Sequence, residues 1–126
     1  MKRIDLVKRV KARRTKLEMT IENLASLSGL GFRTVTRFFA GDDVKLSSVE
    51  QITQVLGLDF AGNEEIDIQR LREARALERA IYIMSLVQDT SALEGQGLDK
   101  EQLDELIEKT KQELLTGEYK DKLWSS

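Results

Sequence analysis

The side chains in this sequence that could take part in chemistry are carboxylates and cationic groups. Cysteine and histidine are both absent, so the chain has no thiolate nucleophile and lacks the commonest general base and metal ligand. The carboxylates of Glu64, Glu65, Asp104, Glu105 and Glu108 have spacings typical of solvated helix faces. No glycine-rich phosphate loop occurs. We therefore expect a protein that is not an enzyme and that needs neither a metal nor a cofactor.

The cationic side chains are unevenly distributed along the 126 residues, although the formal net charge is only −2. Residues 1–40 contain ten Lys/Arg against three Asp/Glu, whereas residues 64–126 contain nine against fifteen. A basic segment suits a phosphate backbone and an acidic one does not, although solvated helices also show both patterns. The start of the chain has no apolar run long enough for a signal peptide or a membrane span, which favours a cytoplasmic protein.

The elements that would position these side chains are all predicted to be helical, since proline is absent and apolar residues recur at helical spacing. Four helices are expected in residues 4–17, 21–28, 32–39 and 47–56. They make up a predicted first domain, residues 1–62, with a hinge at Ala61-Gly62-Asn63. Residues 63–126 are expected to form a long helix and, after a break at Gly95-Gln96-Gly97, a last helix capped by Asp99 that completes a helical hairpin.

The most informative stretch is TIENLASLSGLGFRTVTRFFAG, residues 20–41. A helix-turn-helix needs a small residue where its helices cross, and Ala25 is at that place. It also needs a glycine in the turn four residues later, which is Gly29, and apolar residues that fix the second helix to the core, which are Val35 and Phe38. With the flanking helices, residues 4–60 resemble the lambda-repressor-like, Cro-type family of transcriptional regulators. The resemblance implies a five-helix-type DNA-binding domain and a repressor that binds operator DNA.

The resemblance also implies roles for individual residues. In this family the second helix of the motif enters the major groove of double-stranded DNA. Base contacts are then expected from Phe32, Arg33, Thr36 and Arg37. Either arginine could offer two donors to guanine O6 and N7, with plain phosphate contact as the alternative. Phe32 stands where the family more often has a polar residue, so it either meets a thymine methyl or packs against Leu30.

Phosphate contacts are expected from Thr20, together with the exposed amides at the start of its helix, because a helix N-terminus attracts anions. Supporting phosphate contacts are expected from Arg13, Arg14 and Lys45, with a solvated face as the alternative. The family often pairs an arginine of the first helix, matched here by Arg14, with a glutamate. Phe39 occupies that second position, so Arg14 is expected to be free for DNA or held by another carboxylate.

The second half of the chain carries an apolar stripe on its long helix. This helix would extend about 38 Å, too long for a small globule to cover. Proteins of this kind usually bind DNA as dimers, because one short helix contacts few base pairs. We expect the stripe to pair with another copy in a homodimer, to fold back internally as a hairpin, or to do both in part. The expected dimer or partner residues are Leu71, Ala74, Leu77, Ile81, Met84 and Trp124.

An alternative function comes from the acidic second half and its apolar tail. Small Cro-type proteins with an acidic helical extension resemble antitoxins, which bind a partner toxin and also repress their own operon. Leu123 and Trp124 would suit such a partner surface, with an inert, frayed terminus as the alternative. A general or prophage-type regulator would have the same sequence features, so both functions stay open at this point.

Overall fold

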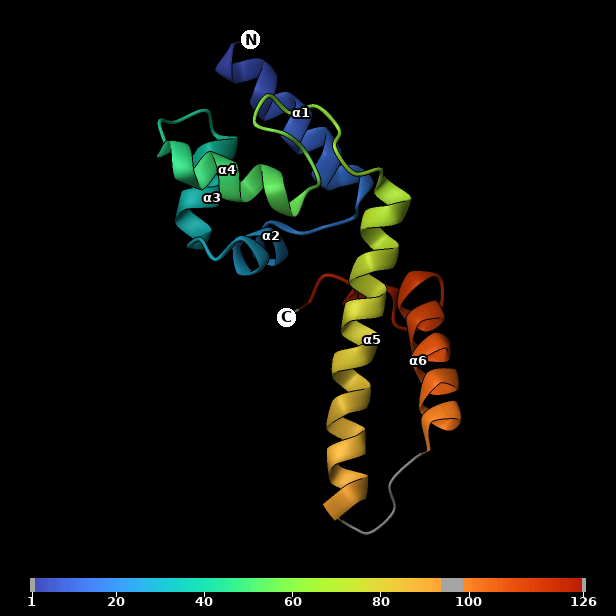
Figure 1. Ribbon diagram of the computed structural model, residues 1–126. Helices are drawn as coiled ribbons and strands as arrows, with labels where there is room; N and C mark the ends of the chain where they lie inside the picture. The colour runs from blue at the N-terminus through green and yellow to red at the C-terminus, as the bar shows by residue number, and fades with distance from the viewer. Residues whose placement is uncertain (1, 94–98, 126) are drawn as a thin grey trace. The chain divides into compact units, whose positions relative to one another are not determined.

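The computed structural model describes residues 2–93 and 99–125, and within this part it is all-helical (Figure 1). The predicted all-α fold is therefore confirmed. In chain order the helices are α1 (Arg3–Lys16), α2 (Ile21–Ser28), α3 (Phe32–Phe39), α4 (Leu46–Val55), α5 (Ile68–Leu93), α6 (Lys100–Leu115) and the 3-10 helix η1 (Lys120–Lys122). The expected break at Gly95-Gln96-Gly97 lies outside the described residues. None of the described helices has both the length and the hydropathy that crossing a bilayer requires.

The chain divides into two compact units, of which the first ends at Leu71 and the second covers Arg72–Ser125. In the first unit α2, α3 and α4 contact one another, and α1 contacts α3. Its core is formed by apolar side chains that are at most 2% exposed: Val10, Leu17, Met19, Leu24, Val35, Phe38, Ile52 and Leu56. Burial of this apolar surface is the main stabilising term for so small a unit.

The turn between α2 and α3 is built around Gly29. This glycine ends α2 with φ 74°, a left-handed conformation that costs a residue without a Cβ very little. The amide of the next residue, Leu30, donates to the Ala25 carbonyl oxygen at 3.1 Å, and Ala25 itself is 7% exposed. The turn and the close crossing that the sequence predicts at these two positions are both present.

The first unit extends beyond the predicted boundary at residue 62. The amides of Glu65 and Ile66 both donate to the Gly57 carbonyl oxygen, at 2.9 and 3.0 Å. The Asp59 carboxylate accepts from the amides of Ala61 and Asn63, and the bond from the Asn63 amide is the main reason why the pKa of Asp59 is lowered. Residues 61–63 are thus fixed within a folded turn, and the expectation of a hinge there is wrong.

The second unit is a helical hairpin closed by the C-terminal tail. Nη2 of Arg72, near the start of α5, donates at 2.7 Å to the carbonyl oxygen of Leu115, at the end of α6, so the two helices run antiparallel. Arg75 donates to the carbonyl oxygens of Leu123 and Ser125, at 2.9 and 2.7 Å. Buried apolar side chains form the interior of this unit: Ala76, Ala80, Met84, Leu114, Leu123 and Trp124. The predicted internal hairpin is therefore present.

Candidate nucleic-acid interface

The outward face of α3 holds the four residues for which base contacts are expected. Val35 and Phe38 are 0% and 2% exposed, so they turn one side of this two-turn helix into the core. The opposite side is solvent-accessible and is formed by Phe32, Arg33, Thr36 and Arg37. A helix about 12 Å long that presents two arginines, a hydroxyl and an aromatic ring has the dimensions and donors that the major groove accepts.

The two arginines of α3 differ in their surroundings. Arg33 has neither a hydrogen bond nor an ion pair with any part of the chain that the structure describes. Arg37 lies 3.7 Å from the Asp42 carboxylate, and its Nη2 donates to the Asp43 carbonyl oxygen at 3.3 Å. Both charges of the Arg37–Asp42 pair are more than half exposed, and such pairs contribute little to stability. Arg33 is therefore available to a ligand directly, and Arg37 after a weak surface contact is broken.

The start of α2 provides a second exposed group of donors. Thr20 is the N-cap of α2: its hydroxyl oxygen accepts from the Asn23 amide at 3.0 Å, and the Asn23 side chain accepts from the Thr20 amide at 3.1 Å. This reciprocal cap fixes the first turn of an exposed helix end, where unpaired amides and the helix dipole favour an anion. Lys45, at the start of α4, is also exposed and makes no ion pair within residues 2–93 and 99–125.

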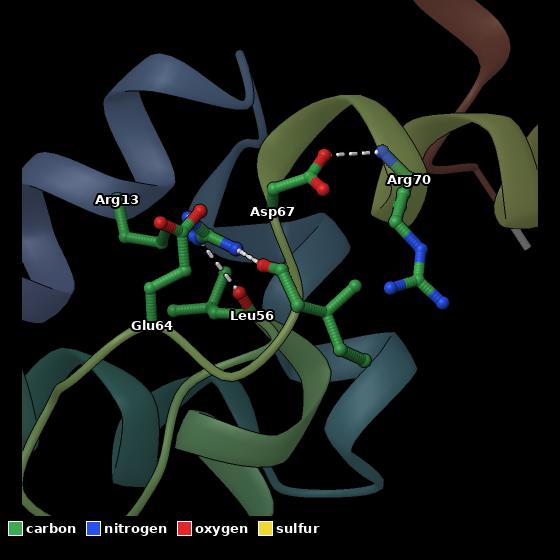
Figure 2. Close-up of polar contacts among 6 residues, drawn as sticks. Arg13, Leu56, Glu64, Asp67 and Arg70 are labelled. Atoms are coloured by element: carbon green, nitrogen blue, oxygen red, sulfur yellow. Dashed lines mark hydrogen bonds and ion pairs between the residues drawn. The ribbon is translucent and has the colours of Figure 1, made fainter.

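The expectation that Arg13 contacts phosphate is wrong, because its side chain is only 7% exposed. Figure 2 shows its guanidinium group among Leu56, Glu64 and the adjoining backbone. Nε donates to the Leu56 carbonyl oxygen at 2.8 Å, Nη1 donates to Glu64 Oε1 at 2.9 Å, and Nη2 donates to the Ile66 carbonyl oxygen. Arg13 therefore joins the end of α1 to the end of α4 and to the segment that leads into α5.

Arg14 already has partners inside the first unit, and no carboxylate among the described residues pairs with it. Its Nη1 donates to the Met19 carbonyl oxygen at 2.9 Å, and its guanidinium carbon lies 5.3 Å from the centre of the Phe39 ring. A cation–π contact of this kind is worth about 0.5–1 kcal/mol at a half-exposed site. Arg14 thus contacts the residue before the cap of α2 and the end of α3.

The surface of the second unit contains only part of the expected dimer or partner residues. Leu77 and Ile81 are 42% and 49% exposed, and Ala74 is exposed on the same side of α5. Leu71, which belongs to the first unit, is half-buried. Met84 and Trp124 are 9% and 6% exposed and lie in the interior of the hairpin, so the expectation that they form a partner surface is wrong.

No family model, curated protein or solved structure matches this chain. In the described residues, no group of three or more carboxylates is arranged to hold a metal ion. The assignment of a function therefore depends on the geometry of the chain itself. The exposed face of α3 and the exposed N-terminus of α2 are the candidate site.

Proposed function

We propose that this chain is a sequence-specific DNA-binding regulator that inserts α3 into the major groove of double-stranded DNA. We propose further that it acts in the cytoplasm as a transcriptional repressor. The observation that carries the proposal is the free guanidinium of Arg33 on the same helix face as Thr36 and Arg37. The proposal agrees with the resemblance of residues 4–60 to lambda-repressor-like, Cro-type domains.

The remaining contacts in this proposal are electrostatic. Thr20 and the amides of the first turn of α2 bind one phosphate, and Lys45 binds another, which sets the orientation of α3 in the groove. With Arg13 and Arg14 occupied inside the protein, the phosphate contacts are fewer than the sequence suggests. DNA affinity should then fall less steeply with salt than a count of the ten N-terminal basic residues would imply.

We further propose that the protein acts as a homodimer through the exposed side of α5, a surface that we define by Ala74, Leu77 and Ile81. Leu77 and Ile81 are large apolar side chains, almost half exposed, on a helix whose opposite side already packs within the hairpin. A second copy would cover them and would place a second α3 on the DNA. Two linked half-sites raise affinity far above that of one.

The second candidate function is an antitoxin, with the same α5 surface covered by a toxin. The exposure of Leu77 and Ile81 favours it as much as it favours a homodimer. Leu123 and Trp124 in the C-terminal tail are buried, so these two side chains do not offer an apolar surface to a toxin. Oligomeric state separates the two: a dimer of the chain alone supports the homodimer, and a monomer supports a different partner.

The base-reading role of α3 is tested by replacing Arg37 with alanine. A two-donor contact to guanine is worth about 1–3 kcal/mol of discrimination. Arg37→Ala should therefore weaken binding to the preferred duplex by that amount and relax the preference at one position, when duplexes selected from a random pool are titrated by fluorescence anisotropy. Arg70→Ala is the matched control, because Arg70 is exposed in the first unit and its side chain makes no ion pair within the described chain. Equal losses on preferred and random duplexes would assign Arg37 to phosphate.

A further inference from the structure

Phe32 is an exposed aromatic residue in the first turn of α3. Its side chain is 52% exposed, so the protein leaves about half of its surface uncovered. Exposing a ring of this size to water forgoes the free energy that burial would supply. A ligand that covers the ring would recover it.

The helix face is organised as two rows. Phe32 and Thr36 are four residues apart and therefore share one row, while Arg33 and Arg37 share the neighbouring row. The Thr36 hydroxyl donates to the Phe32 carbonyl oxygen at 2.8 Å. Since that hydroxyl has already used its one proton, it can only accept further hydrogen bonds, and the Thr36 methyl group beside it is free for apolar contact. The first row therefore offers a ring and a methyl group but no free donor, and the second row is cationic.

The major groove contains one apolar group that such a row would recognise, namely the methyl on C5 of a pyrimidine. Thymine carries it, and 5-methylcytosine carries the same group at the same position. Guanine offers O6 and N7 to an arginine. Because the rows adjoin one another, a methyl-bearing pyrimidine and a guanine at neighbouring base pairs would satisfy both.

We propose that Phe32 determines specificity by contacting the C5 methyl of a pyrimidine next to a guanine bound by Arg33. This inference depends on the proposed DNA-binding function and adds to it the chemical group that is recognised. Phe32 acts by burying the methyl group, Thr36 extends the apolar row, and Arg33 fixes the register of the neighbouring guanine.

The test removes single methyl groups from the DNA. A duplex is first selected by the intact protein from a random pool, and each thymine is then replaced singly by uracil, which differs only in lacking the methyl. Burial of one methyl-sized group corresponds to about a fourfold change in affinity. We expect one or two uracil positions per half-site to weaken binding about fourfold, and the others to have no effect. At the same positions, a 5-methylcytosine–guanine pair should bind about fourfold more tightly than a cytosine–guanine pair, because only the methyl group differs.

The protein variants link the effect to one side chain. Phe32→Ala should bind thymine and uracil duplexes equally, while Phe60→Ala, which removes a 46% exposed phenylalanine elsewhere in the first unit, should keep the fourfold difference. Equal binding of all uracil duplexes by the unaltered protein would overturn the proposal and leave DNA binding in place. Loss of the difference in both variants would also overturn it. Failure to select any duplex would contradict the proposed function itself.

Discussion

Replacing Arg13 with alanine is expected to lower the free energy of unfolding by about 3 kcal/mol. The substitution takes the donor from the buried Leu56 carbonyl oxygen and from the Ile66 carbonyl oxygen, and a buried acceptor left unpaired costs about 1–3 kcal/mol. The ion pair with Glu64 adds little, because that carboxylate is 53% exposed. Urea unfolding followed by circular dichroism measures the loss.

The matched control for this change is Arg33→Ala, which removes the same charge from an exposed side chain without a partner in the described chain. It should leave the free energy of unfolding within about 0.5 kcal/mol of the unaltered value while weakening DNA binding. The opposite pattern would contradict the structure. If Arg13→Ala unfolded like the unaltered protein and weakened DNA binding, Arg13 would be a phosphate contact, as the sequence suggests.

The second large effect is expected from Ile81→Glu. Ile81 is on the exposed side of α5, whereas Ala76 and Ala80 on the buried side are 0% exposed, so the hairpin should remain folded. A carboxylate at this position would oppose burial against a second copy. Sedimentation should show a monomer, and DNA affinity should fall by about 10²–10⁴-fold as the linked second half-site is lost.

Leu106→Glu is the control for the α5 surface, because it places the same charge on α6 at a leucine that is 36% exposed. It should leave the dimer intact. An unaltered protein that sediments as a monomer at tens of micromolar would contradict the homodimer and favour a different partner for the α5 surface.

The features of the first unit that follow from local chemistry could be predicted from the sequence. Helical periodicity placed Val35 and Phe38 inside and the four α3 residues outside, because an amphipathic helix has one apolar side. The position of Gly29 follows from its freedom to adopt a positive φ. The cap at Thr20 follows from the capacity of a hydroxyl to accept a backbone amide.

The predictions that are wrong concern residues whose partners are backbone groups, and such partners leave no signature in the sequence. Arg13 looks like its neighbouring surface cations, and it is buried because the carbonyl oxygens of Leu56 and Ile66, 43 and 53 residues away, face its guanidinium group. Backbone carbonyls are the same at every residue, so no pattern reveals this pairing. The turn at residues 57–66 likewise has no sequence signature, because its hydrogen bonds are mostly between backbone groups.

The second unit shows the limit of apolar periodicity on a long helix. One set of residues, Ala76, Ala80 and Met84, packs inside the hairpin, and another, Leu77 and Ile81, stays exposed. Both sets recur at helical spacing, so the sequence indicates one broad stripe and does not say which side is covered. Trp124 is 6% exposed, and Arg75 holds the backbone on either side of it through the carbonyl oxygens of Leu123 and Ser125.

Amide hydrogen exchange of the intact protein, with and without a duplex that it selects from a random pool, tests the DNA-binding face most directly. Exchange should become slower on binding in residues 20–23 and 31–37, where the N-terminus of α2 and the exposed face of α3 would lie against DNA. Slower exchange confined to α5 and α6, with α3 unchanged, would contradict it.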